Sequence, residues 1–217
     1  MERAPFLLEG TMAMVNGSDG LLKEIRACTL CKGLPLGQRP IVQFSANSKL
    51  LIVGQAPGRI THSKGIPFDD PSGNRLRDWL GLRRDEFYDD QKLAIVPMGF
   101  CFPGTGKGGD LPPRPECAAT WRTRILDTLT SVELTIIIGR YAIDWHQPDQ
   151  KSRSVTEAVK DWQRLWPKKI ILPHPSPRNN RWLKQNPWLN LNRKCLLKKN
   201  PKFLKLISPL KLKQNKI

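Results

Sequence analysis

Four short apolar segments, separated by longer amphipathic ones, constrain the fold of this chain more than any other feature of its sequence. The apolar segments are Leu50–Val53, Leu93–Val96, Leu134–Ile138 and Ile170–Leu172. Each is rich in Ile, Val and Leu without polar alternation, a pattern typical of strands that are buried on both faces. Because strand and helix patterns alternate along the chain, we expect an α/β fold, with a parallel sheet of four strands covered by helices on both sides.

Helical periodicity fills the intervals between these segments. The expected helices are Asn74–Leu80 (closed by Gly81), Cys117–Leu129, Arg140–His146 and Val155–Trp166. A further helix is expected before the first strand, because Leu21, Leu22 and Ile25 fall on one face after a cap at 18–20. We divide the chain into an N-terminal extension (1–20), one domain (21–192) and a basic C-terminal tail (193–217).

The charge of the chain is strongly positive. Its 217 residues include 36 Lys and Arg against 19 Asp and Glu, which gives a net charge of +17. Nine of those basic residues, and no acidic residue, lie in the tail 193–217. A polyanionic partner explains such an excess, and nucleic acid is the commonest one. The tail taken alone is equally well explained as a solubilising segment.

The sequence offers no segment for membrane insertion or export. No apolar run approaches the ~20 residues that span a bilayer, and residues 1–20 lack the basic and apolar regions of a secretory signal. We therefore expect an intracellular protein, cytoplasmic or nucleoid-associated, and a monomer. In that setting five cysteines, two of them in a Cys-x-x-Cys pair, favour metal binding or redox use over disulfides.

Four of those cysteines are candidate metal ligands. They are Cys28, Cys31, Cys101 and Cys117. The first two can bind one metal from a single turn, and the fold must bring the other two to them. Four thiolates suit tetrahedral zinc and a [4Fe–4S] cluster equally well, and their spacing does not choose between the two. Cys195 lies in the basic tail, and we do not expect it to be a ligand.

Unusual residues directly follow the expected strands. These loops are 54–58, 97–115, Gly139 and 174–179. The carboxyl ends of parallel strands meet at one edge of a sheet, where open α/β sheets bind ligands. An aromatic ring (Phe68), a carboxylate (Asp69 or Asp70), an imidazole (His174) and a guanidinium (Arg178) would converge there. Such a set can hold a flipped base and stabilise charge at its glycosidic bond.

These motifs resemble the uracil-DNA glycosylase superfamily, specifically its iron–sulfur branch (families 4 and 5). The resemblance rests on four features in order, over about residues 21–190: Gly54-Gln55-Ala56-Pro57-Gly58, the segment Gly65–Gly73, the four cysteines, and His174-Pro175-Ser176-Pro177. It implies a three-layer αβα sandwich and a structural [4Fe–4S] cluster, with zinc the less favoured metal. It also implies a DNA-repair hydrolase that removes a deaminated base, with uracil favoured, from DNA and leaves an abasic site.

The resemblance also assigns roles to residues. Phe68 would stack on the flipped base, His174 would stabilise the departing base, and Asp70 would position or activate water; a plain helix cap is the other interpretation of Asp70. The remaining base contacts would come from Gln55, Ala56 and backbone groups near Met98. The predicted DNA contacts are Arg59, Lys64, Arg178 and Asn179, with Arg178 and its loop as a wedge in the duplex. Binding should then weaken steeply with salt.

Two departures from the family pattern keep other functions open. Pro97 stands where many relatives carry an Asn that reads uracil, and Ala56 stands where some carry an acid. A glycosylase for another base, such as hypoxanthine, or a non-catalytic iron–sulfur protein that binds DNA therefore remain alternatives. His62 lies where relatives often have acids, and a solvated loop position is the simplest interpretation of it, ahead of a ligand contact or a nucleophile.

Overall fold

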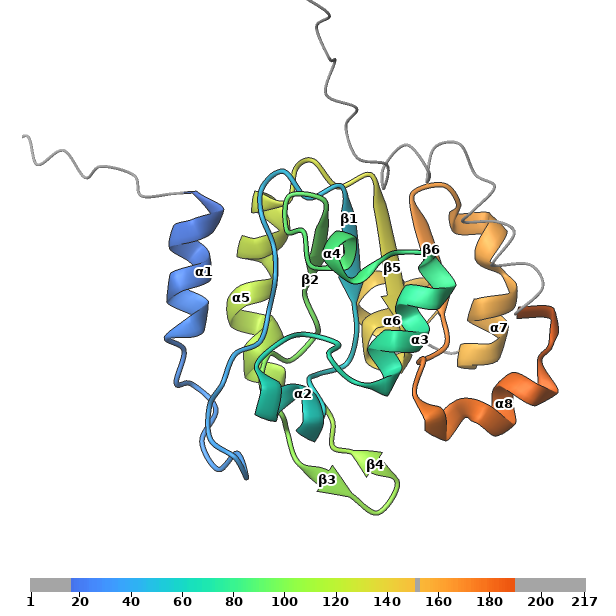
Figure 1. The fold of residues 1–217 in the computed structure, drawn as a ribbon, viewed down its shortest axis with the longest axis horizontal. Coiled ribbons are helices and arrows are strands. Elements are labelled where there is room, and N and C mark those ends of the chain that lie inside the picture. The colour runs from blue at the N-terminus through green and yellow to red at the C-terminus, as the bar shows by residue number, and fades with distance from the viewer. Residues whose placement is uncertain (1–16, 151–152, 190–217) are drawn as a thin grey trace, which may run out of the picture.

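The computed structural model describes residues 17–150 and 153–189, and these form a three-layer α/β sandwich around one parallel sheet (Figure 1). The strands of this sheet are β1 (Leu50–Val53), β2 (Leu93–Ile95), β5 (Leu134–Ile138) and β6 (Lys169–Leu172). Their order across the sheet is β2-β1-β5-β6, and all three neighbouring pairs are parallel. The predicted fold class and all four predicted strands are confirmed.

The helices connect these strands and cover both faces of the sheet. They are α1 (Ser18–Arg26), α2 (Arg59–Lys64), α3 (Pro71–Leu80), α4 (Arg84–Phe87), α5 (Pro115–Thr128), α6 (Arg140–His146), α7 (Val155–Lys160) and α8 (Asn180–Gln185), with short 3-10 turns η1 (Pro148–Gln150), η2 (Trp162–Leu165) and η3 (Pro177–Asn179). In the described part of the chain, none of these helices is long and apolar enough to cross a membrane.

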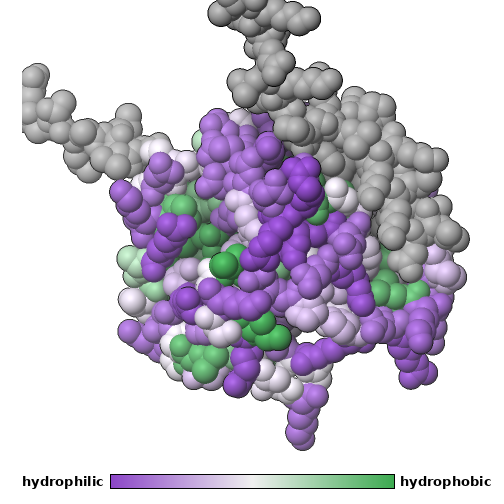
Figure 2. Space-filling model, viewed as in Figure 1, coloured by the Kyte–Doolittle hydropathy of each residue, from purple (hydrophilic) through white to green (hydrophobic). Residues whose placement is uncertain are grey.

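Side chains of each strand alternate between two apolar cores. In β1, Leu51 and Val53 face the core beneath α1, α5, α6 and α7, whereas Leu50 and Ile52 face the core beneath α3 and α4. Both faces are therefore buried, which is why the strand sequences lack polar alternation. The face drawn in Figure 2 is mostly hydrophilic, with hydrophobic residues in small separate patches.

Local structure departs from the sequence prediction in several places, among them the unpredicted short helices α2, α4 and α8. The N-cap of α1 is Gly17, so Ser18 is the first helical residue and lies within the predicted extension. The expected helix Val155–Trp166 ends at Lys160 and continues as the 3-10 turn η2. The loop after β2 contains a small antiparallel hairpin of β3 (Thr105–Gly106) and β4 (Gly109–Asp110). The basic tail 193–217 and Cys195 lie outside the described residues.

Candidate functional site

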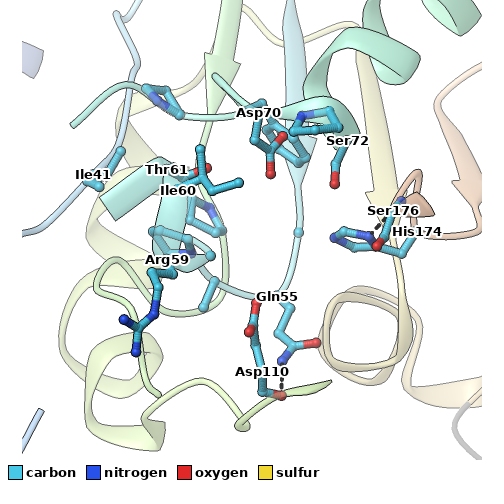
Figure 3. Close-up of a pocket in the computed structure, with 18 of the residues that line it drawn as sticks. Ile41, Gln55, Arg59, Ile60, Thr61, Asp70, Ser72, Asp110, His174 and Ser176 are labelled. Atoms are coloured by element: carbon cyan, nitrogen blue, oxygen red, sulfur yellow. Dashed lines mark hydrogen bonds between the residues drawn. The ribbon is translucent and has the colours of Figure 1, made fainter. Parts of the chain in front are cut away.

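A cavity of about 430 Å³ opens at the carboxyl ends of β1, β2 and β6. It lies within the range of ~300–1,000 Å³ typical of small-molecule sites. Its walls come from the turn after β1, the segment that leads into α3, the end of β2, the hairpin β3–β4 and the loop after β6. Three of the four loops predicted at one edge of the sheet therefore meet in one cavity, which Figure 3 shows in close-up, whereas Gly139 does not line it.

Phe68 enters this cavity on a tight turn before α3. Its backbone is left-handed (φ 54°), and its ring meets Phe87 edge-to-face at a centroid distance of 6.4 Å. The turn needs Gly73 on α3, because a Cβ atom there would lie only 1.7 Å from the Phe68 carbonyl oxygen. Gly54 lies beside the ring, where a Cβ would be 3.6 Å from Phe68 Cζ, an ordinary contact distance. Gly73 is therefore the glycine that the turn requires to place the ring that is predicted to stack on a base.

Asp70 both caps α3 and lines the cavity. Its Oδ1 accepts a hydrogen bond from the Gly73 amide at 2.8 Å, which is the helix-cap geometry. Figure 3 shows the carboxylate pointing into the cavity. Among the described residues no donor is bonded to Oδ2, so that oxygen is available to a ligand. The two interpretations of Asp70 are therefore compatible with each other.

Asp69, the other candidate carboxylate, is held outside the cavity by ion pairs. Its oxygens lie 2.6 Å from Arg84 and 3.3 Å from Lys64. The hydrogen bond from Arg84 lowers the pKa of Asp69 to about 2, with Lys64 adding to the effect. Lys64 was predicted as a DNA contact, and the structure gives its ammonium group a partner within the protein. The pairs brace the turn that carries Phe68.

His174 points into the cavity from the loop after β6 (Figure 3). Its Nδ1 accepts a hydrogen bond from the Ser176 amide at 3.2 Å. Burial lowers the pKa of His174, although the nearby carboxylates of Asp70 and Asp110 oppose that shift. The imidazole is therefore neutral at pH 7, and because Nδ1 accepts, Nε2 carries the proton. The cavity thus contains a neutral N–H donor.

The loop that carries His174 is tied down from two sides. The Asn179 side-chain amide donates to the His174 carbonyl oxygen at 2.8 Å. Arg75 on α3 donates to the carbonyl oxygens of Pro175 and Ser176, each at 3.1 Å. Asn179, predicted as a DNA contact, has this internal bond, and its role toward DNA stays a prediction. Sequence reasoning missed the clamp by Arg75, because its partners lie 100 residues away.

The turn after β1 is joined to the hairpin and to the end of β2. The Gln55 amide donates to the backbone carbonyls of Leu111 at 2.8 Å and Asp110 at 3.3 Å, and Gln55 and Ala56 both line the cavity. Backbone groups near Met98 were predicted to contact the base; the Met98 amide is bonded to the Gly54 carbonyl oxygen at 2.8 Å, and its side chain packs in the core. Pro97 lines the cavity instead.

The end of β2 is supported from behind by a buried guanidinium. Arg122 on α5 is only 1% exposed and donates to the carbonyl oxygens of Val96 at 3.2 Å and Pro97 at 3.0 Å. It also bonds His146 Nε2 at 2.6 Å, and that imidazole has its pKa lowered to about 3 by burial, Arg122 and Lys169. His146 is therefore neutral and accepts from Arg122. Nothing in the sequence pattern pointed to this pair.

Two basic residues lie at the mouth of the cavity. Arg59 begins α2, is exposed, and has its guanidinium 5.9 Å from the ring centre of Phe102. Arg178 is exposed and adjoins the hairpin, since a Cβ on Gly109 would lie 2.7 Å from its guanidinium. Both line the cavity, so both are placed to meet phosphates around a base that enters it.

His62 corrects an expectation from the sequence, because it is buried. It belongs to α2, is 7% exposed and lies 6.2 Å from the ring of Phe102. Burial and the neighbouring Arg39 lower the pKa of His62. A solvated loop position is therefore wrong, and His62 does not line the cavity. The short helix α2 carries no periodicity from which its burial could be predicted.

The four candidate cysteines line a second, small cavity near the first. It lies between the segment after α1, the loop after β2 and the start of α5, and all four thiols are free. The Phe100 amide donates to Cys117 Sγ at 3.3 Å. Burial raises the pKa of Cys117 to about 12 and that of Cys101 to about 11, and the other thiols add to both shifts.

The donor set of this second cavity fits a metal centre in type and number. Four sulfur donors from distant segments around one cavity are what a tetrahedral thiolate site needs. Within residues 17–150 and 153–189, however, no three His, Cys, Asp or Glu side chains converge closely enough to hold a metal ion. The fold thus brings the cysteines to one place without forming the coordination geometry.

The fold and the first cavity define an α/β protein in which an aromatic ring and polar side chains surround one cavity at the edge of a parallel sheet. A sequence model of the Uracil DNA glycosylase superfamily matches residues 41–198, and the chain belongs to this superfamily. It is also 34% identical over 84 residues to the type-4 uracil-DNA glycosylase of Archaeoglobus fulgidus. That similarity covers 36% of this chain and 42% of the relative's length. Together these likenesses support a glycosylase-like function.

Proposed function

We propose that this protein is a DNA glycosylase that hydrolyses the N-glycosidic bond of a flipped, deaminated base and leaves an abasic site. Uracil is the favoured base. The observation that carries the proposal is the neutral imidazole of His174, whose Nε2–H is the donor in a cavity that also contains Phe68 and Asp70. The family membership of residues 41–198 supports the same reaction class.

Each of these side chains would act at a different part of the nucleotide. Phe68 would stack on the face of the flipped base. His174 Nε2–H would donate to a base carbonyl oxygen, where negative charge grows as the bond to C1′ breaks. The Asp70 carboxylate would lie beside the sugar and stabilise the positive charge that develops at C1′. A neutral donor suits this role because it stabilises the departing anion without giving up its proton.

The route to the cavity supports DNA as the partner. Arg59 and Arg178 lie at its mouth on different segments, and their guanidinium groups would contact phosphates on either side of the extruded nucleotide. Such contacts position the strand and carry no sequence information. The loop around Arg178 would also be the segment that fills the gap left in the duplex.

A [4Fe–4S] cluster held by Cys28, Cys31, Cys101 and Cys117 is part of the proposal, with zinc as the less favoured metal. When bound, such a centre would supply structural crosslinking and no step of the hydrolysis. The cysteines come from the segment after α1, the loop after β2 and the start of α5. Crosslinking them would hold together the loop that leads from Pro97 to the hairpin.

Pro97 favours a second candidate function, removal of another deaminated base. It lines the cavity and has no side-chain group that could hydrogen-bond a base edge. The amide of Met98 is bonded to Gly54 and does not replace that group. Hypoxanthine or xanthine in place of uracil would use the same His174 donor and the same Asp70 carboxylate.

Two variants test the chemistry. We expect His174→Ala and Asp70→Asn each to lower the single-turnover rate of base excision by roughly 10²–10³-fold, the usual cost of losing a positioned charge-stabilising group. Binding to the same DNA should change little, because the proposal assigns the phosphate contacts to Arg59 and Arg178. Glu133→Gln is the matched control: Glu133 precedes β5 at the opposite edge of the sheet, and its ion pair with Lys49 is long and exposed.

The outcome that would contradict the proposal is equally clear. If wild-type protein with its metal centre intact binds DNA but excises no base, the non-catalytic alternative is correct. If both variants excise as fast as wild type, His174 and Asp70 do not form the site. In that second case the glycosylase activity stands, and the cavity is not where it occurs.

A further inference from the structure

A second carboxylate points into the cavity from the loop after β2, one of the loops expected at this edge of the sheet. Asp110 is the last residue of β4, and Figure 3 shows its side chain directed into the cavity from the side opposite Asp70. Its Oδ2 lies close to Gly58, where a Cβ would be 3.3 Å away. Within the described ranges no donor or cation is bonded to this carboxylate, and the residue is exposed to solvent.

The position of Asp110 does not depend on its carboxylate. Its backbone is fixed by the pairing with Thr105 across the hairpin and by the Gln55 amide, which donates to the carbonyls of Asp110 and Leu111. The amide of Leu111 closes the loop by donating to the Gly104 carbonyl oxygen at 2.9 Å. The backbone at Asp110 is therefore held in place, and both carboxylate oxygens are available to accept a proton.

Asp70 is less suited to take a proton. One of its oxygens accepts the Gly73 amide as the cap of α3, so only the other oxygen is available to take a proton. Asp110 has no such bond. It lies near enough to His174 that its charge, like that of Asp70, raises the pKa of the imidazole against the effect of burial. The two carboxylates and the imidazole therefore surround the same space.

The turn after β1 supplies no competing group. Ala56 lines the cavity next to Gln55 and has no polar side chain, and the amide nitrogen of Gln55 is bonded to the hairpin. On this side of the cavity the hairpin contributes the carboxylate. The sequence did not single out Asp110 within its loop, because it follows two glycines in a stretch that looks like a surface turn.

This inference rests on the proposed glycosylase function. We propose that Asp110 is the general base of the reaction and that Asp70 stabilises the sugar. The Asp110 carboxylate accepts a proton from a water molecule as the water oxygen bonds to C1′. The C1′–N bond breaks, and its electron pair leaves with the base, whose anion is bonded by His174 Nε2–H. Asp110 then returns its proton to solvent, and the departing base takes one up, so that one water is consumed.

The test compares three variants on the base that wild-type protein excises best among uracil, hypoxanthine and xanthine in duplex DNA. We expect Asp110→Asn and Asp110→Ala to lower the single-turnover rate by roughly 10²–10³-fold, within the range for loss of a general base. Affinity for DNA should stay within about threefold of wild type or rise, because a negative charge is removed near phosphates. Glu133→Gln controls for the loss of one carboxylate and should match wild type.

Rescue by a small carboxylate separates a base from a structural residue. Sodium formate should raise the rate of Asp110→Ala at least tenfold over sodium chloride of equal ionic strength, because formate can occupy the vacated space and accept the proton. It should not raise the rate of Asp70→Asn, in which the side-chain volume is filled. Asp110→Asn keeps the backbone bonds from Gln55, and a thermal melt confirms that each variant is folded.

Three results would overturn the inference. Asp110→Asn within threefold of wild type, with Asp70→Asn inactive, would make Asp70 the base. If Asp110→Ala has a low single-turnover rate that formate does not raise, Asp110 has a structural role and is not the general base. Wild-type protein that excises none of the bases would refute the proposed glycosylase function itself. That result differs from a failure of the Asp110 assignment alone, in which wild-type protein still excises a base.

Discussion

Gly73→Ala is the substitution whose consequence follows most directly from the geometry of the site. A Cβ atom at position 73 would lie 1.7 Å from the Phe68 carbonyl oxygen, 2.6 Å from its carbonyl carbon and 2.9 Å from its Cβ. Real Cβ contacts lie beyond 3.0 Å, so the Phe68 backbone must move by at least about 1.3 Å. Most other helical glycines would gain stability from this change, by up to about 1 kcal/mol.

The displacement falls on the residue that is predicted to stack on the base. Moving a positioning group by about 1 Å can cost on the order of 100-fold in rate, equivalent to about 2.7 kcal/mol of transition-state stabilisation. Crowding costs a further ~1–3 kcal/mol of folding stability, against the gain in helix propensity. We therefore expect kcat/KM for base excision to fall about 100-fold, while the free energy of unfolding changes by no more than about 2 kcal/mol.

The assay is single-turnover excision together with urea unfolding of the same preparations. Gly108→Ala is the matched control, because nothing lies within 4 Å of a Cβ there and its φ is not in the left-handed region. The control should excise at the wild-type rate. Excision by Gly73→Ala within threefold of wild type, with the fold intact, would refute the argument that the turn at Phe68 sets the geometry of the site.

Two further predictions concern stability and metal content. Burial lowers the pKa of His146 to about 3 from 6.5; the unfolded chain therefore takes up a proton below pH 6.5 that the folded protein refuses, and stability falls as pH falls from 6.5 towards 3, by about 2 kcal/mol at pH 5. Urea unfolding at pH 7 and pH 5 should show this loss of unfolding free energy in wild type, and in His146→Gln the loss should be smaller by about 2 kcal/mol. Equal losses in the two proteins would contradict the lowered pKa of His146. Cys117→Ala, purified without oxygen, should lose the bound iron and its visible absorption, whereas Cys195→Ala should keep both; zinc in the wild-type protein, or full iron content in Cys117→Ala, would refute the cluster.

The sheet was predictable because its strands are buried on both faces. Ile52 and Ile136 are fully buried, and such positions leave an unbroken apolar run in the sequence that few other structures produce. The convergence of His174 and Phe68 followed from the same pattern, since loops after parallel strands must meet at one edge. The short motifs then predicted a role for each side chain that the topology brings to this edge.

What could not be predicted depends on contacts between distant segments. Asp110 lies on a hairpin of two-residue strands, and such short strands leave no periodic signal. His62 is buried because Phe102 and Arg39 pack against it, and both are far from it in sequence. Met98 looked available to a ligand, yet its amide completes a bond to the Gly54 carbonyl oxygen. These contacts become visible only when the loops are folded against each other.

The central claim is that this cavity removes a deaminated base from DNA, and one measurement tests it most directly. Labelled oligonucleotides with a single uracil, hypoxanthine or xanthine, both single- and double-stranded, are incubated with protein that retains its metal centre and are then treated with alkali. We predict strand cleavage at the modified position for at least one of these bases, and its loss in His174→Ala. Intact strands throughout, with DNA still bound, would contradict the account and make this a DNA-binding protein without glycosylase activity.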